Sequence, residues 1–173
     1  MTRKRLWAPW RVSYISSMRK VESKSCLFCR KGRLRDGRGE REYILRRGRF
    51  SFSLLNRYPY NSGHLLIAPY RHLGRFELLN QEEWLEILDL ANDAMSRLGK
   101  AMAPDGYNIG INLGRAAGAG IPGHLHLHIV PRWVGDTNFM PACADAKVLS
   151  QSLGSAYRML KPAGVSGVKR RRR

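Results

Sequence analysis

The chain has 173 residues, of which 43% are hydrophobic, and this size and composition suit one globular domain with its own core. No apolar run approaches the roughly 20 residues of a membrane span, and the basic N-terminus lacks the apolar stretch of a signal peptide, which argues against a membrane or secreted protein. Three cysteines, an odd number, fit a reducing compartment better than a disulfide framework, so we expect a cytoplasmic protein.

The net charge of +18 lies in the two ends of the chain. Residues 1–50 hold 16 Lys and Arg against 4 Asp and Glu, and residues 158–173 hold 7 against none. Residues 51–157 hold 8 against 9 and are therefore nearly neutral. The basic ends could contact RNA, DNA or another polyanion, which leaves a nucleic-acid-associated protein as an alternative function.

Composition divides the chain into three parts. We expect a basic, aromatic arm over 1–25, a folded domain over 26–160 and a basic, disordered tail over 161–173. Within the domain, a loop rich in Gly and Arg precedes short apolar and aromatic runs that are typical of strands. The strand candidates are Tyr43–Arg46, Phe50–Asn56, His64–Ala68 and Tyr107–Asn112.

Two helices are expected. Asn80 is a good N-cap, and Glu83 follows three residues later, as in a capping box. An apolar stripe at spacings of three and four then continues the long helix and could face either the core or a dimer interface. Its members are Trp84, Leu88, Ala91, Met95, Leu98 and Met102. A shorter C-terminal helix is predicted from Val148, Leu149, Leu153, Ala156, Tyr157 and Leu160. Paired strands around one long helix indicate an α+β fold with a largely antiparallel sheet.

Three of the five histidines, His124, His126 and His128, occupy every second position of the stretch GHLHLHIVPRW. Alternation with leucine and isoleucine predicts a strand with the histidines on one face and the apolar side chains on the other. Pro131 cannot donate a ladder hydrogen bond, so the strand is expected to end near Val130.

The histidine face could carry chemistry. Neutral imidazole is a nucleophile and a general base near pH 7. The glycine-rich loop over 114–123 could aim backbone N–H groups at an anion, so loop and histidines together predict a phosphoryl-transfer site. Three other interpretations stay open: a catalytic zinc held by the histidines, a solvated strand face, and a loop that is only a flexible connection.

Cys26 and Cys29 are separated by two residues and could supply half of a tetrahedral zinc site. Distant residues must supply the other half; otherwise the pair is simply two reduced, partly buried thiols. Cys143 has no evident partner and is expected to pack. His64 is expected to brace the sheet or the site, and Trp133 to serve either packing or substrate contact.

The pattern His124-Leu-His126-Leu-His128-Ile-Val resembles the His-φ-His-φ-His-φ-φ motif of the histidine triad (HIT) family, where φ is an apolar residue. SLLNRYPYNSGHLLIAPYRH resembles the family's upstream strands, and GYNIGINLGRAAGAGIPG resembles the loop before its triad. LWAPWR, NRYPYNSGH, GINLG and PRWVGDTNF look most like the bacterial branch that contains diadenosine tetraphosphate phosphorylases. The resemblance covers about residues 6–160. It implies a HIT-like antiparallel sheet of about five strands with one long helix and a C-terminal helix.

The resemblance also implies an enzyme that cleaves dinucleoside polyphosphates, such as diadenosine tetraphosphate, at the α-phosphate through a nucleotidyl-histidine. His126 maps to the nucleophile, so its other ring nitrogen should donate to a backbone carbonyl. His128 maps to a residue that contacts the phosphate or helps the leaving group. Water as acceptor would make the enzyme a hydrolase and inorganic phosphate a phosphorylase, and the branch resemblance slightly favours the phosphorylase.

Further residues are implied to hold the substrate. Asn56 matches a residue that contacts the nucleoside, although it could equally be a polar residue at the start of a turn. One more residue separates the phosphate-binding asparagine from the triad here than in some branches. The phosphate-binding set is implied to be Asn112, Gly118, Ala119, Gly120 and Ile121. HIT proteins of this type are commonly homodimers joined through the sheet and the long helix.

Some HIT relatives bind zinc through a cysteine pair, the histidine of a P-x-x-H segment and the first triad histidine. The matching residues here are Cys26, Cys29, His72 and His124. The resemblance therefore implies a structural zinc and no organic cofactor. A ligated His124 would contribute to catalysis by positioning the strand, leaving the chemistry to His126 and His128.

Overall fold

The structure, a computed structural model, describes residues 26–34, 42–137 and 149–162. The predicted arm, Cys143 and most of the basic tail lie outside the described residues. The elements in chain order are α2 (Leu27–Gly32), β1 (Ile44–Arg47), β2 (Ser51–Leu55), β3 (Leu65–Pro69), the short 3₁₀ helix η2 (Phe76–Leu78), α3 (Gln81–Met102), β4 (Gly106–Ile111), β5 (Leu127–Arg132) and α5 (Leu153–Leu160).

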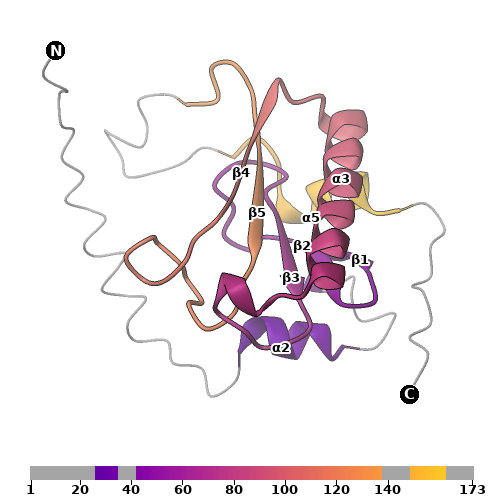
Figure 1. Cartoon of the computed structure of the whole chain (residues 1–173). Coiled ribbons are helices and arrows are strands. Elements are labelled where there is room, and N and C mark those ends of the chain that lie inside the picture. The colour runs from indigo at the N-terminus through magenta and orange to yellow at the C-terminus, as the bar shows by residue number, and fades with distance from the viewer. Residues whose placement is uncertain (1–25, 35–41, 138–148, 163–173) are drawn as a thin grey trace, which may run out of the picture.

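The five strands form one antiparallel sheet in the order β1-β2-β3-β5-β4 (Figure 1). Neighbours in sequence pair with one another, except that β5 inserts between β3 and β4. The histidine strand therefore lies inside the sheet, with a hydrogen-bonded partner on each side. The predicted α+β fold with an antiparallel sheet is confirmed, and the predicted strands differ from the observed ones by a residue or two at their ends.

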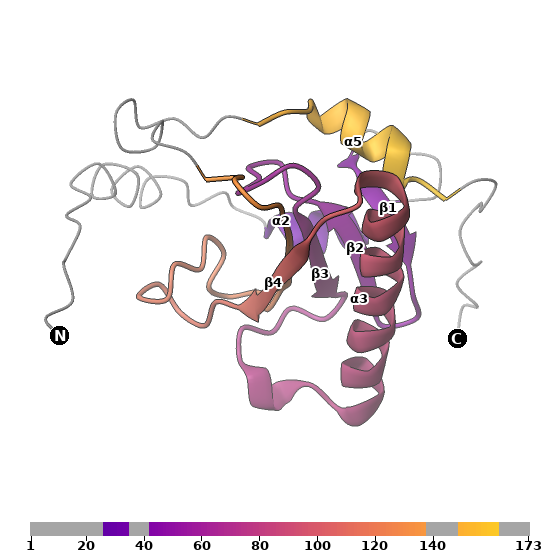
Figure 2. The ribbon, with the colours of Figure 1, turned by 90° about the horizontal axis from the view of Figure 1, so that it is seen from above.

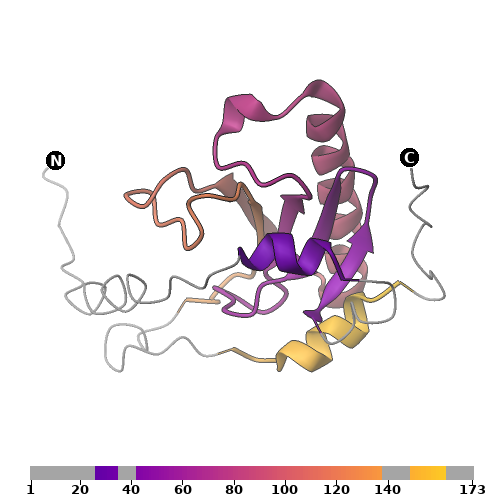
Figure 3. The same ribbon diagram turned by 90° about the horizontal axis from the view of Figure 1, so that it is seen from below.

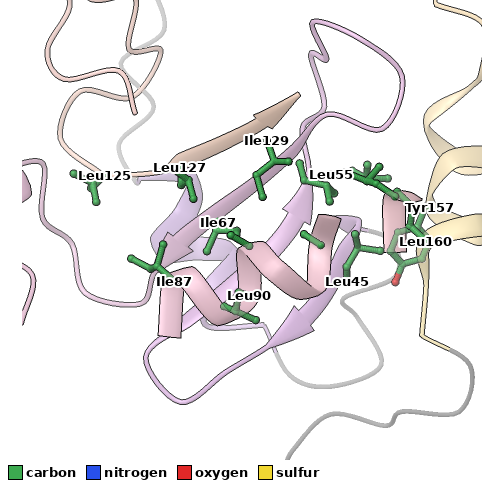
Figure 4. Close-up of a cluster of buried hydrophobic side chains, with 14 of the residues drawn as sticks. Leu45, Leu55, Ile67, Ile87, Leu90, Leu125, Leu127, Ile129, Tyr157 and Leu160 are labelled. Atoms are coloured by element: carbon green, nitrogen blue, oxygen red, sulfur yellow. The ribbon is translucent and has the colours of Figure 1, made fainter. Parts of the chain in front are cut away.

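The main core fills the space between the sheet and two helices, α3 and α5, which pack on the same face (Figure 2). Figure 4 shows Ile67 and Ile129 from the sheet facing Ile87 from α3, with Leu160 of α5 at one end of the cluster. A second, smaller cluster surrounds Phe28 on the opposite face of the sheet, where α2 lies across the strands (Figure 3). Both faces of the central strands are therefore covered.

The long helix begins as predicted. The side chain of Asn80 accepts the backbone N–H of Glu83, and Glu83 in turn accepts the backbone N–H of Asn80, which completes the capping box. The predicted apolar stripe belongs only partly to the core: Leu98 and Ala91 are buried, Leu88 is 52% exposed, and the other buried positions include Ile87 and Ala94. The helix has more apolar residues than one face can hold, and only packing against the sheet decides which of them turn inward.

The histidine strand begins later than predicted. β5 begins at Leu127, so His128 lies in the strand and His124 and His126 precede it. The predicted strand with all three histidines on one face is therefore wrong. The ladder with β3 begins only at Leu127, and the N–H of Leu125 donates instead to the carbonyl of Leu73, beyond the end of β3.

The strand also ends later than predicted. β5 ends at Arg132, beyond Pro131, so the predicted end near Val130 is wrong. The pairing with β3 stops at Ile129, and beyond it only β4 lies alongside. The missing N–H of Pro131 therefore interrupts no ladder on the β3 side.

The C-terminal helix begins at Leu153, after Ser152, whose side chain accepts the N–H of Ser155. The predicted stripe began too early, because Leu149 lies outside the helix and is 37% exposed. Val148 lies outside the described residues. Among the described helices, including the 22-residue α3, none has the length and apolar content needed to span a membrane.

Candidate active site and metal centre

His126 presents one ring nitrogen as a lone pair. Its Nδ1 lies 2.7 Å from the backbone carbonyl oxygen of His124, which can only accept, so Nδ1 carries the proton. The lone pair of the neutral ring is therefore on Nε2, as the sequence led us to expect. Burial lowers the pKa of His126 below its usual 6.5, so the ring is neutral at pH 7. Such an imidazole can act as a nucleophile or a base.

His128 has the opposite tautomer, which a chain of hydrogen bonds fixes. The backbone N–H of Tyr60 donates to Nδ1 of His64 over 3.0 Å, so His64 carries its proton on Nε2. That Nε2 donates to Nδ1 of His128, also over 3.0 Å, and leaves the proton of His128 on Nε2. Burial lowers the pKa of His64 to about 3 and that of His128 to about 4, so both rings stay neutral near pH 7.

The Nε2–H of His128 is an unsatisfied hydrogen-bond donor. The nitrogen is buried and has no hydrogen-bond partner among the described residues. Buried donors normally have a partner, and an unsatisfied one costs on the order of 1–3 kcal/mol. His128 lines a cleft of about 380 Å³, and Asn112 lies in the same cleft. An anionic oxygen bound there would satisfy the donor.

The glycine-rich loop supplies fewer free amides than its composition suggested. The N–H of Gly118 donates to the carbonyl of Arg115, and that of Ala119 donates to the carbonyl of Gly114, so both are used inside the loop. The N–H groups of Gly120 and Ile121 bond to no described residue. These two amides stay available for a phosphate, and Asn112 lies beside the loop, its amide nitrogen 3.9 Å from where a Cβ on Gly118 would stand.

Asn56 is bonded within its own turn. Its Oδ1 accepts the backbone N–H of Tyr58 over 3.0 Å, and its Nδ2 lies 3.3 Å from Nδ1 of His64. Asn56 is not among the residues that line the cleft beside His128. Its observed contacts are those of a polar residue at the start of a turn.

A thiol-imidazole cluster lies at the other end of the histidine run. The structure brings together the four residues Cys26, Cys29, His72 and His124, whose ligand atoms all lie within 4.8 Å of one another. Nε2 of His124 donates to the carbonyl of Pro69 over 2.9 Å, which leaves the lone pair on Nδ1. That Nδ1 lies 3.3 Å from the sulfur of Cys26 and 3.6 Å from that of Cys29. Two thiols and two imidazoles converging on one point suit a tetrahedral Zn²⁺.

Two aromatic residues that the sequence did not single out pack on the histidines. Phe28, only 1% exposed, has its ring centroid 5.1 Å from that of His124 and 4.8 Å from that of His126. Tyr60 lies parallel to His128, with the two centroids 5.9 Å apart. Their positions inside the C-L-F-C and NRYPYNSGH segments were the available signals. Trp133 lines a separate cavity and donates from Nε1 to the carbonyl of Met102, which is a packing arrangement.

The chain is similar to known proteins over most of its length. Residues 43–134 match the family model of the HIT domain. The chain is 35% identical over 162 residues to the AP-4-A phosphorylase of Mycobacterium tuberculosis, with 90% of this chain and 82% of that protein covered. It is 30% identical over 93 residues to the asymmetrical bis(5'-nucleosyl)-tetraphosphatase of Schizosaccharomyces pombe, with 54% of this chain and 50% of that protein covered. Both relatives are named as enzymes.

The fold has a match among solved structures. A zinc-bound histidine triad family protein from Mycobacterium smegmatis superposes with a TM-score of 0.61, covering 80% of this chain and 91% of that chain, at 23% sequence identity. The sheet and its helices are therefore of the HIT type.

Proposed function

Because the chain belongs to the HIT domain family, we propose that it cleaves dinucleoside polyphosphates, such as diadenosine tetraphosphate, through a covalent nucleotidyl-histidine. One observation carries this proposal: neighbouring histidines hold opposed tautomers. His126 offers a lone pair on Nε2, and His128 offers a proton on Nε2. The two ring centroids are 4.9 Å apart, so a nucleophile and a donor can act on the same phosphate.

The reaction would run in two displacements. Nε2 of His126 attacks the α-phosphorus, the bond to the bridging oxygen breaks, and its electrons leave on that oxygen with the departing nucleotide. The Nε2–H of His128 donates to the charge that develops on the oxygens, as an oxyanion donor does. An acceptor then attacks the same phosphorus and frees His126. Inorganic phosphate as acceptor would give ADP and ATP from diadenosine tetraphosphate, and water would give AMP and ATP.

Phosphate is our proposed acceptor. The Mycobacterium tuberculosis relative, named as a phosphorylase, matches nearly the whole of this chain, whereas the relative named as a tetraphosphatase matches about half of it. The available amides of Gly120 and Ile121 and the side chain of Asn112 are the groups we propose for holding the substrate phosphates.

The test is intact-mass spectrometry of wild type and His126→Ala after brief incubation with diadenosine tetraphosphate. Quenching above neutral pH protects the acid-labile phosphorus-nitrogen bond. We expect a nucleotidyl adduct on wild type only, and a loss of turnover in the variant of about a thousandfold or more. ADP that forms only when phosphate is present supports the phosphorylase, and AMP without phosphate indicates a hydrolase. Equal turnover by both proteins would contradict the covalent mechanism.

We also propose that Cys26, Cys29, His72 and His124 hold a structural zinc ion. The lone pair on Nδ1 of His124 faces both sulfurs, which supports this assignment. The ion would fix α2 and the start of the histidine run, while the carbonyl of His124 accepts from His126 and holds the nucleophile's tautomer. No step of the proposed reaction passes through the metal.

A homodimer is proposed on the exposed apolar side chains of the long helix and the edge strand. Leu85 and Leu88 on α3 are 55% and 52% exposed, and Ile109 on β4 is 49% exposed. Exposed apolar residues on the strand at the edge of a sheet and on a helix favour association. Light scattering that gives a mass near twice 19.7 kDa would support the dimer, and a monomer mass would contradict it.

A further inference from the structure

The cleft beside His128 continues along the sheet as a groove, beyond the nucleophile. Its floor comes from alternate positions of two strands, which share one face. The pairing places Gly110 of β4 opposite His128, and Asn108 opposite Val130. Arg132 lines the far end. Arg132 is the fourth residue after His128 in the extended strand, which places the two roughly 13 Å apart.

Gly110 keeps the groove open beside His128. A Cβ built on this glycine would meet no atom of the described residues within 4 Å, so none of them fills the space above the strand. A strand normally favours β-branched or aromatic residues, and glycine weakens it. The missing side chain leaves room for a ligand next to the unpartnered Nε2–H of His128.

Arg132 is held in a fixed orientation at the far end. Its Nε and Nη2 donate to the two carboxylate oxygens of Asp136 over 2.6 and 2.7 Å, and its Nη1 donates to Oδ1 of Asn108 over 2.6 Å. Asn61 also donates to Asp136, whose side chain is only 7% exposed. The side chain of Arg132 is 42% exposed and lines the groove, whereas Asp136 does not. Nη2 also donates to Oγ1 of Thr137 over 3.3 Å. The groove thus ends at a guanidinium whose charge is paired with Asp136 and which keeps one N–H, on Nη1, without a partner among the described residues.

We infer that this groove binds the leaving nucleotide of the substrate, and that Arg132 and Asn108 contact its distal phosphates. The inference rests on the proposed function. In that reaction the leaving oxygen lies in line with the attacking nitrogen of His126, so the leaving group points away from His126. His128, which would contact the phosphate on the side of the leaving group, lines the groove, whereas His126 does not line it. A polyphosphate chain departing there meets amide donors and then a guanidinium, which binds phosphate well.

The test compares two substrates that share the adenylyl half and differ in the leaving group. Diadenosine tetraphosphate must fill the groove, whereas adenosine 5′-phosphoramidate, which loses only ammonia, does not reach its far end. Gly110→Val should lower kcat/KM for diadenosine tetraphosphate by about tenfold more than it lowers kcat/KM for the phosphoramidate, because both substrates meet His128 and only the first fills the groove. Arg132→Lys and Asn108→Ala should raise KM for diadenosine tetraphosphate by about three- to tenfold with little change in kcat, because a remote contact is made equally in ground and transition states.

Gly99→Ala is the control. Gly99 lies in α3, a Cβ on it has Oη of Tyr107 at 3.9 Å as its nearest neighbour among the described residues outside the backbone of α3, and it does not line the groove. This variant should leave the ratio of the two kcat/KM values unchanged, and melting temperatures should show that all variants are folded. Equal losses on both substrates, or the same ratio in Gly110→Val as in wild type, would overturn the groove assignment while leaving the proposed function in place. Wild type that turns over neither substrate would overturn both.

Discussion

The two ends of the histidine run, residues 124–128, differ in chemistry although each is a histidine next to a leucine. At the thiol end, defined here as His124 with Cys26, Cys29 and His72, a lone pair on Nδ1 faces two sulfur atoms. At the cleft end, defined as His128 with His64 and Tyr60, Nδ1 accepts from another imidazole and the ring offers a proton to the cleft. Between them His126 donates to a backbone carbonyl.

This difference shows that the hydrogen-bond partner of one ring nitrogen decides what the other nitrogen can do. When one ring nitrogen donates to a backbone carbonyl, the other nitrogen keeps a lone pair that can bind a metal or attack phosphorus. When one ring nitrogen accepts from another imidazole, the other nitrogen keeps a proton that can bind an oxyanion. A run of five residues can therefore combine a candidate metal ligand, a candidate nucleophile and a hydrogen-bond donor using a single residue type. Four experiments separate the contributions of the two ends.

The largest effect is expected at the thiol end. Cys29→Ala should lose bound zinc and lower the melting temperature by about 10 °C or more, because metal binding stabilises only the folded state. Metal analysis and thermal melting of the purified protein measure both effects. Cys143→Ala, which changes a cysteine outside the ligand set, should keep the zinc. A Cys29→Ala variant with full zinc content would contradict the assignment.

The cleft end should make stability depend on pH. Burial lowers the pKa of His128 to about 4 and that of His64 to about 3, from the ordinary 6.5. At pH values between these lowered pKa values and 6.5, the unfolded chain binds more protons than the folded chain, so the free energy of unfolding rises with pH. This stability is complete above about pH 6.5 and is lost as pH falls through 4 toward 3, by about 1.4 kcal/mol for each unit by which a pKa is lowered. Denaturant titrations across this range measure it, and a His64→Asn variant with the same slope as wild type would contradict it.

His64 itself should matter for rate without affecting the metal. His64→Phe removes the donor that fixes the tautomer of His128, and we expect kcat to fall about tenfold to a hundredfold, less than removal of a whole oxyanion donor costs. Zinc content should equal that of wild type, because His64 touches only the cleft end. His64→Asn keeps a side-chain donor and should recover part of the rate. Loss of zinc in His64→Phe would mean that the two ends are not independent.

The smallest effect is expected at Phe28, which packs on both His124 and His126 and thus joins the thiol end to the proposed nucleophile. Phe28→Leu keeps an apolar side chain of similar size and should lower the free energy of unfolding by about 1 kcal/mol. Denaturant unfolding measures this loss. The change should weaken zinc retention slightly while leaving the pH slope of the cleft end intact. A larger change in the pH slope than in zinc retention would contradict this placement of Phe28.

The sequence predicted much of the fold because several local signals agree. The capping box at Asn80 and Glu83, the alternating pattern of the histidine run and the paired strand candidates each specify local structure, and together they give the correct fold class. The errors arose where one local pattern allows two arrangements. Leu88 fits an apolar stripe as well as Ile87 does, and Pro131 ends a strand only where it interrupts a ladder.

The candidate residues were visible in the sequence: three histidines at alternate positions, a cysteine pair, and the distant His72 that resemblance assigned to it. The tautomer of each histidine came from the folded structure alone. A tautomer depends on partners from β3, from the turn before it and from neighbouring backbone, up to 64 residues away in the chain. The open groove over Gly110 and the fixed guanidinium of Arg132 were equally invisible in the sequence, because both arise from strand register, which brings distant residues opposite one another.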